Sequence, residues 1–204
     1  MAFEQNEYYK EKFSKLDLSH EIFRFKSFEE CEFNNCSFIE CKFEKTRFLN
    51  CTFNHCILSA VVPMNCRLNE VKFTECKVIG LDWTKAQKVS EIEFHQSQIN
   101  YSNFKLMALP KIKIIQCEAK EVDFTEADLS QGVFRGTDFE KSRFFKTNLS
   151  QADFKDAHNY YIDVNNNTLK KTHFSMPEAI NLLRSLDIIL DENCTLEDSH
   201  GSKI

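Results

Sequence analysis

The sequence is poor in the residues that make flexible or tightly turned chains. Among 204 residues there are only 4 Gly and 3 Pro, and a single Trp. A chain with many glycine turns or Gly- and Pro-rich linkers would need more of both. Its length is that of one ordinary domain. We therefore expect a single domain without flexible linkers and with few tight glycine turns.

Excess positive charge and long apolar segments are also lacking. The net charge is −5, which disfavours a general nucleic-acid binder because such proteins neutralise phosphates with Lys and Arg. The longest apolar stretch, Ile57 to Met64, is too short to span a bilayer. The first residues are charged and contain no apolar segment typical of a secretory signal. The sequence predicts a cytoplasmic protein that does not bind nucleic acid or membranes directly.

Phenylalanine, in contrast, is abundant and regularly spaced. Most of the 20 Phe residues fall on two series with a period of five, and the phase slips by one residue between the series. The first series is Phe23, Phe28, Phe33, Phe38, Phe43, Phe48, Phe53, Leu58, Pro63, Leu68, Phe73, Val78 and Trp83. The second is Phe94, Ile99, Phe104, Leu109, Ile114, Ala119, Phe124, Leu129, Phe134, Phe139, Phe144, Leu149 and Phe154. Two residues before each centre lies a mostly small residue, often Cys, and the other three positions are mostly polar.

A period of five matches neither an amphipathic helix nor an alternating strand. It matches a chain that turns a corner every five residues, with one large and one small side chain pointing inward. Four corners close a square coil of twenty residues, and stacked coils lie about 4.8 Å apart. The pattern predicts about six and a half coils, roughly 31 Å of rod on that spacing.

This repeat, A/C-x-F/L-x-x in effect, resembles the pentapeptide-repeat family over residues 21–157. The resemblance implies an all-β fold, a right-handed quadrilateral β-helix. Some members, the Qnr/MfpA-type proteins, are acidic rods that imitate duplex DNA and bind DNA gyrase or topoisomerase IV. The resemblance therefore implies a Qnr/MfpA-like protein that modulates quinolone sensitivity as one hypothesis of function. Because one fold hosts many functions, it does not decide that point.

Seven of the nine Cys residues occupy the small inward position of the first series, and Cys117 occupies it in the second. Cys31, Cys36 and Cys41 would lie on three different sides of a square coil, and no C-x-x-C or suitably spaced His accompanies them. Stacked Cys side chains would point inward in parallel, which is a poor geometry for a disulfide. We interpret these Cys residues as small core residues and predict no metal site.

The series are interrupted twice. Phe94 lies eleven positions after Trp83 instead of ten, and we predict a bulged corner or short loop at about 84–93. Pro63 takes an inward position without a backbone donor, which predicts a local bulge.

Both ends of such a rod need covering. We predict an N-terminal cap at 1–20 and a C-terminal cap at 158–204, with an α-helix at about 176–186 and a frayed tail. Ser175 and Glu178 have the spacing of a capping box, with Pro177 at the first helical position. The apolar face of this helix consists of Ala179, Leu182, Leu183 and Leu186. In some family members the equivalent end forms a tail-to-tail dimer, so the resemblance implies a homodimer through this cap.

The sequence contains no catalytic signature. None of the six His residues lies in an H-x-x-x-H or H-E-x-x-H arrangement, and there is no P-loop, G-x-S-x-G or G-x-G-x-x-G motif. We therefore expect no enzyme activity, no catalytic residue and no cofactor.

One acidic cluster stands out as a candidate partner-binding site. It consists of Glu118, Glu121, Asp123, Glu126 and Asp128. The resemblance implies that such carboxylates could replace DNA phosphates on a topoisomerase. A twenty-residue offset, however, places Glu121, Asp123 and Glu126 beside Lys141, Arg143 and Lys146, and Lys120 beside Glu140. Such exposed pairs would neutralise much of the field that a DNA mimic needs.

The alternative hypothesis is a structural scaffold that binds another protein. It predicts a surface of mixed charge with some other patch. The exposed apolar region expected at Ile57, Val62, Met64 and Ile79 is the candidate for that patch.

Overall fold

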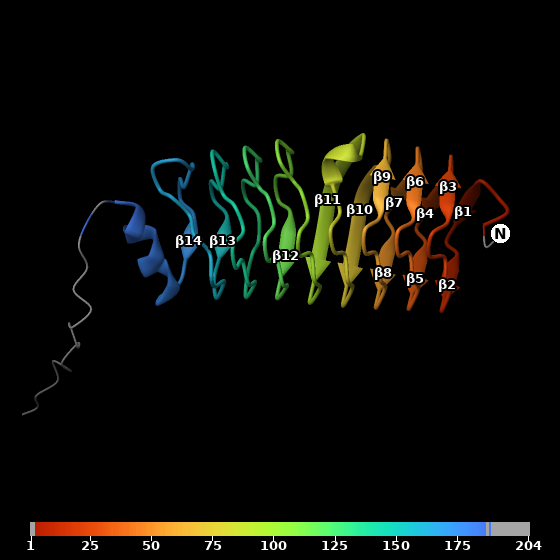
Figure 1. The fold of residues 1–204 in the computed structure, drawn as a ribbon, viewed down its shortest axis with the longest axis horizontal. Helices are drawn as coiled ribbons and strands as arrows, with labels where there is room; N and C mark the ends of the chain where they lie inside the picture. The colour runs from red at the N-terminus through yellow and green to blue at the C-terminus, as the bar shows by residue number, and fades with distance from the viewer. Residues whose placement is uncertain (1–2, 187, 189–204) are drawn as a thin grey trace, which may run out of the picture.

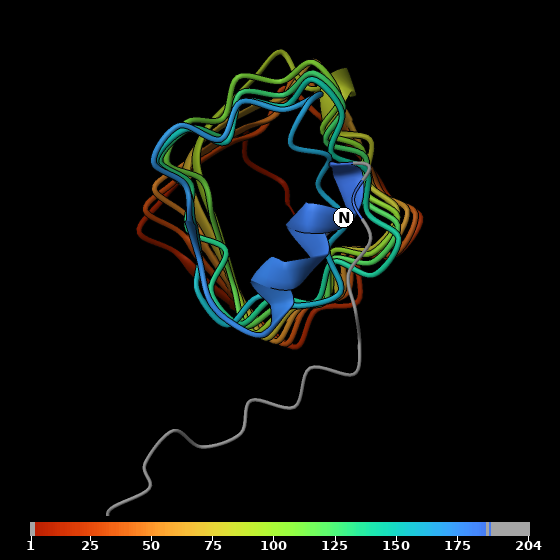
Figure 2. The same ribbon diagram turned by 90° about the vertical axis from the view of Figure 1, so that its left-hand side faces the viewer.

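The chain forms one rod of stacked rectangular coils. The structure is a computed structural model that describes residues 3–186 and 188. Figure 1 shows the coils side by side along the rod, and Figure 2 shows that, viewed along the axis, they superpose in a four-sided outline. The rod is a parallel β-solenoid of about eight coils, so the predicted quadrilateral β-helix is confirmed.

The strands are short and nearly all pair in parallel with the next coil. In chain order the elements are β1 (Glu7–Tyr9), β2 (Lys12–Ser14), β3 (Ile22–Arg24), β4 (Ser27–Glu29), β5 (Glu32–Asn34), β6 (Lys42–Glu44), β7 (Arg47–Leu49), β8 (Thr52–Asn54), β9 (Val62–Met64), β10 (Arg67–Thr74), the 3-10 helix η1 (Trp83–Lys85), β11 (Lys88–His95), β12 (Lys113–Ile115), β13 (Asp153–Phe154), β14 (His173–Phe174) and the 3-10 helix η2 (Glu178–Ser185). The register between coils is twenty residues, as in Phe33 opposite Phe53, until η1.

We name the four sides of the rod by their central residues. Side A carries Phe23, Phe43, Pro63, Trp83, Phe104, Phe124 and Phe144; side B carries Tyr8, Phe28, Phe48, Leu68, Val89, Leu109, Leu129 and Leu149; side C carries Phe13, Phe33, Phe53, Phe73, Phe94, Ile114, Phe134 and Phe154; side D carries Leu18, Phe38, Leu58, Val78, Ile99, Ala119 and Phe139. Most of these side chains are fully buried and form columns along the axis. In side C the rings of Phe33 and Phe53 stack at 4.6 Å, an arrangement that adds to the free energy of burial.

The coil extends beyond both predicted limits. β1 pairs with β4, and β2 pairs with β5, inside the segment 1–20 for which a separate cap is predicted. At the other end β14 pairs with β13, past residue 157. The predicted limits are too narrow because Tyr8, Phe13 and Leu18 continue the first series in phase, as Phe174 continues the pairing of the last coils.

The phase slip lies directly after η1, at Gln87 and Lys88. Across it Arg67 pairs with Lys88, an offset of 21, whereas the coils before it and after it are offset by twenty residues, as in Glu93 with Lys113. The extra residue makes the backbone N–H groups of both Gln87 and Lys88 point at the carbonyl of Cys66, at 2.8 and 3.2 Å. The predicted loop at 84–93 is therefore shorter than expected, since regular pairing resumes at Lys88.

The corners require a left-handed backbone, and, as the low Gly content predicts, few of them are glycine turns. Nearly every fifth residue has a φ of about 50–64°, and most of these residues are not Gly, for example Lys45 at 51° and Lys111 at 64°. Such a conformation costs an ordinary residue roughly 1–2 kcal/mol. The hydrogen bonds between coils and the filled core offset that cost at each corner.

The C-terminal cap differs from the prediction in its helix type. Residues Glu178–Ser185 form a 3-10 helix instead of an α-helix, and Pro177 precedes it with no side-chain cap. Ser175 does not complete the predicted capping box because its hydroxyl accepts the backbone N–H of Asp156 in the last full coil, at 2.8 Å. The predicted frayed tail lies outside the described residues.

Candidate interaction surfaces

The five acids of the predicted cluster are not gathered on one surface. Glu118 lies on side D and Glu121 at the next corner; Asp123 lies on side A and Glu126 at the following corner; Asp128 lies on side B. They follow one coil around the rod, because residues adjacent in this sequence lie on successive sides. Asp123 and Asp128 are half-buried and accept backbone N–H groups from Thr125 and Ser130, so part of their hydrogen-bonding capacity is used within the corners.

One of the four predicted ion pairs forms among the described residues. Lys120 contacts Glu140 at 3.1 Å and also Asp138 at 3.1 Å. Burial alone would raise the pKa of Asp138, but hydrogen bonds from Asn159 and Lys120 outweigh it and hold that pKa below its usual value. Lys146 lies over the ring of Phe145, 5.5 Å from its centroid. The predicted coil register is correct, while the long side chains take other partners.

Elsewhere the rod pairs opposite charges between neighbouring coils. Lys12 contacts Glu32 at 3.1 Å, and Arg24 contacts Glu44 at 2.7 Å. Lys113 contacts Glu93 at 2.7 Å, and the second carboxylate oxygen of Glu93 lies 2.9 Å from Nε2 of His95. The surface is therefore of mixed charge, as the scaffold hypothesis predicts.

The stacked Cys residues belong to the core, as interpreted. All eight Cys residues within residues 3–186 are buried and free. In one column the backbone N–H of Cys36 lies 3.4 Å from Sγ of Cys56, and that of Cys56 lies 3.3 Å from Sγ of Cys76. No group of three or more possible metal ligands occurs among the described residues. Nor does that part of the chain contain a helix long and apolar enough to cross a membrane.

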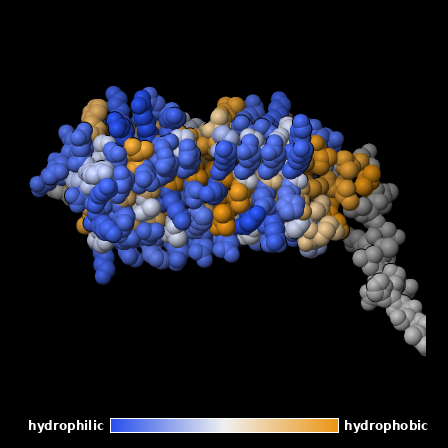
Figure 3. Space-filling view, turned by 180° about the vertical axis from the view of Figure 1, so that it is seen from behind, coloured by the Kyte–Doolittle hydropathy of each residue, from blue (hydrophilic) through white to orange (hydrophobic). Residues whose placement is uncertain are grey.

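The C-terminal cap exposes apolar side chains. Of the predicted face, Leu182 packs against the core and Ala179 is half-buried, whereas Leu183 and Leu186 are exposed. Figure 3 shows apolar residues gathered at this end of the rod, next to the atoms drawn in grey. The other apolar region expected from the sequence is weaker: Met64 is exposed, but Ile57, Val62 and Ile79 are each half-buried.

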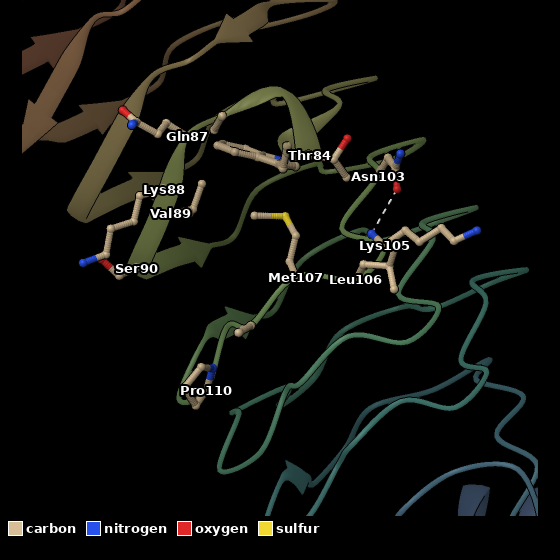
Figure 4. A pocket seen from close by; sticks show the side chains of 13 residues that line it. Thr84, Gln87, Lys88, Val89, Ser90, Asn103, Lys105, Leu106, Met107 and Pro110 are labelled. Carbon is tan, nitrogen blue, oxygen red and sulfur yellow. Dashed lines mark hydrogen bonds between the residues drawn. The ribbon is translucent and has the colours of Figure 1, made fainter.

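A shallow groove lies beside the phase slip, where sides A and B meet. It has a volume of about 910 Å³, and its lining includes Trp83, Val89, Leu106, Met107 and Pro110. Figure 4 shows Met107 extending toward Val89 while the ammonium group of Lys105 points away from the groove. Met107 takes an inward position that is small in most coils and is only partly buried there. The sequence did not predict this groove because the groove depends on the geometry of η1.

Models of two repeat families match the chain. The pentapeptide repeat region model matches residues 26–104, and the model of eight pentapeptide-repeat copies matches residues 122–158. The chain belongs to the pentapeptide-repeat family. No curated protein matches its sequence.

Solved structures share the fold. Among them is a trypsin-treated variant of QnrB1, a plasmid-mediated fluoroquinolone resistance protein, with a TM-score of 0.71 and 18% identity over 91% of this chain and 98% of that one. A second trypsin-treated QnrB1 variant has a TM-score of 0.68 and 18% identity, and the match covers 88% of this chain and 100% of that one. Full-length QnrB1 has a TM-score of 0.55 and 18% identity, and the match covers 89% of this chain and 100% of that one. At this identity the likeness establishes the fold alone.

Proposed function

We propose that this chain is a non-enzymatic, protein-binding rod. The observation that carries the proposal is the regular ladder of outward side chains on each side, held in register by parallel pairing such as that of Lys42 with Val62. A rigid ladder presents side chains to a partner without ordering them at the moment of binding, which lowers the cost of association. The mixed charge of this surface favours a protein partner over DNA mimicry along a single acidic stripe.

DNA gyrase or topoisomerase IV is the second, more specific candidate as partner, with modulation of quinolone sensitivity as the consequence. The likeness to QnrB1 over 98% of that chain favours it. The test is supercoiling by purified gyrase with this protein titrated in, with and without a fluoroquinolone. Inhibition, or rescue from the drug, at micromolar protein supports this partner. If neither topoisomerase of the source organism is affected, this partner is excluded. Pull-down from that organism then identifies the partner of the rod.

The exposed apolar end supports a homodimer through the C-terminal cap as part of the same proposal. Leu183 and Leu186 are 36% and 41% exposed, and a tail-to-tail contact would bury them. The test is sedimentation of the full chain and of a Leu183→Asp/Leu186→Asp variant. A dimer that the double variant dissociates supports the contact. Met64→Asp is the matched control, since Met64 is 40% exposed on a side of the rod. If the parent chain sediments as a monomer, the proposed homodimer is contradicted.

A further inference from the structure

Side B carries a stack of three cations that departs from the charge pattern of the rod. Arg67 is in register with Arg47 in the preceding coil and with Lys88 in the following coil. All three side chains are exposed. Consecutive strands lie about 4.8 Å apart, so the three charges follow the rod axis over roughly 10 Å. We name this set the basic stack.

Like charges directly opposite each other destabilise neighbouring strands. At several equivalent positions elsewhere the rod pairs opposite charges, as in Lys12 with Glu32 and Lys113 with Glu93. Where Glu118 lies in register with Asp138, Lys120 contacts Asp138 at 3.1 Å. Within the described residues, no carboxylate lies within 4.0 Å of a cation of the basic stack, and Nε of Arg67 donates to the neutral side chain of Gln87 at 2.9 Å. A ligand that supplies negative charge would offset this repulsion.

The surroundings give such a ligand access to the guanidinium groups. A groove of about 290 Å³ lies on one flank of the two Arg side chains, lined also by Lys45, Asn65 and Gln87. A second groove of about 310 Å³ lies on the other flank, and its lining includes Lys88. Carboxylates can therefore approach each guanidinium from either side, which suits the bidentate geometry that Arg favours.

The basic stack leads directly into the apolar groove beside η1. Lys88 lines both the groove on the flank of the stack and the 910 Å³ groove. Beyond Lys88 along the axis the surface becomes apolar, with Ala108, Pro110 and the 66% exposed side chain of Leu106. Two kinds of chemistry thus lie in one line: three cations, then an apolar groove one coil further.

We propose that this line binds an extended acidic segment of a protein partner, with an apolar side chain anchored in the groove. The proposal rests on the function proposed above and names the chemistry of the partner. An extended peptide rises about 3.3 Å per residue and its side chains alternate between two faces, so acidic residues at positions i and i+2 face the basic stack. An apolar residue at position i+4 faces the same way and reaches the groove. The carboxylates satisfy the cations, and the apolar anchor covers Leu106 and Met107.

Fluorescence anisotropy with the full chain tests this proposal. The probe is a fluorescein-labelled Gly-Glu-Glu-Glu-Ser-Leu-Gly peptide, with control peptides that carry Gln for Glu or Ala for Leu. We expect saturable binding in 50 mM salt that weakens at 200 mM, with at least tenfold weaker binding for either control peptide. Arg47→Glu/Arg67→Glu should weaken binding at least tenfold. Lys42→Glu/Lys72→Glu, which reverses two exposed charges on sides A and C, should change it less than twofold.

A second variant addresses the apolar anchor. Leu106→Asn keeps a residue that tolerates the left-handed backbone at this corner, where φ is 62°. We expect it to remove the preference for Leu over Ala in the peptide while leaving the salt dependence intact. Circular dichroism melting of each variant confirms that the rod is folded.

Three outcomes would overturn the proposal. The first is no saturable peptide binding at millimolar concentration, and the second is equal weakening by the two charge-reversal variants. The third is tighter binding of a short DNA duplex than of the peptide at the basic stack, which would assign it to nucleic acid. The two proposals fail separately. If a captured partner binds the Arg47→Glu/Arg67→Glu variant as tightly as the parent chain, the rod binds proteins elsewhere, so the functional proposal stands and this surface is not the site.

Discussion

Gly132 lies against the ring of Phe134, and an added Cβ at Gly132 would come within 2.7 Å of Cζ of that ring. It would also lie 2.9 Å from the carbonyl oxygen of Leu129. Gly132 fills the small inward position of its pentad, and Phe134 is its buried centre. The smallest residue is thus required here by packing and not by backbone conformation.

We predict that Gly132→Ala lowers the free energy of unfolding by about 1–3 kcal/mol, because it overfills a packed coil. Urea denaturation measures the change. Adding Phe134→Leu should recover part of it, since a smaller ring-free side chain makes room for the methyl group. If the two substitutions are additive in a double-mutant cycle, the steric contact is not the cause.

Phe124 and Glu126 are two residues apart but face opposite directions. The ring of Phe124 is fully buried between those of Phe104 and Phe144, at 5.4 and 5.1 Å, while Glu126 is exposed at a corner. We predict that Phe124→Asp unfolds the rod, because it buries an unpaired charge. Glu126→Lys should change the thermal midpoint by no more than a surface substitution does. Equal effects of the two would contradict the inward and outward assignment.

Much of this fold follows from the sequence because each inward position repeats every five residues. The same repeat explains why the order of residues along the chain does not show directly which outward residues are neighbours in space. Acids that are neighbours in sequence, such as Glu118 and Asp123, lie on different sides, whereas Arg47 and Arg67 are neighbours in space only because a coil has twenty residues. The basic stack could therefore have been found in the sequence by comparing outward residues twenty positions apart, such as Arg47 and Arg67. Lys88 breaks that spacing because the phase slip places it 21 residues after Arg67.

The caps and corners were less predictable for a different reason. Hydrophobic periodicity indicates which residues are buried, but it does not indicate φ. The left-handed corners are imposed by closure of the coil, so residues such as Lys111 adopt them despite their intrinsic preference. The 3-10 form of η2 likewise depends on how the last coil uses Ser175, a contact that no local sequence pattern specifies.

The corner backbone yields a prediction at Lys111, whose φ is 64°. We predict that Lys111→Val lowers the free energy of unfolding by roughly 1–2 kcal/mol or more, because a β-branched residue is strained in this region. Lys111→Gly should leave it unchanged or raise it, since Gly adopts positive φ without a steric cost. Lys72→Val, at an exposed position in the strand β10, is the control and should have little effect. A similar loss for both Val variants would contradict the argument from backbone conformation.

The buried thiols predict a loss of stability in alkali. Burial raises the pKa of Cys51 to about 12 and that of Cys66 to about 11, against about 9 for the unfolded thiol. Burial likewise raises the pKa of Cys117 to about 12. Above pH 9 the unfolded chain releases these protons while the folded chain retains them. The stabilisation is therefore complete below pH 9 and is lost as the pH rises toward 11–12.

Each such thiol lowers the free energy of unfolding by about 1.4 kcal/mol per pH unit in that range. The measurement is the urea midpoint at pH 8, 9 and 10, which should fall steeply above pH 9. Cys51→Ala/Cys117→Ala should make the fall shallower, even though the variant is less stable at pH 8, because it removes two of the titrating groups. An unchanged pH dependence in this variant would show that the alkaline loss comes from other residues.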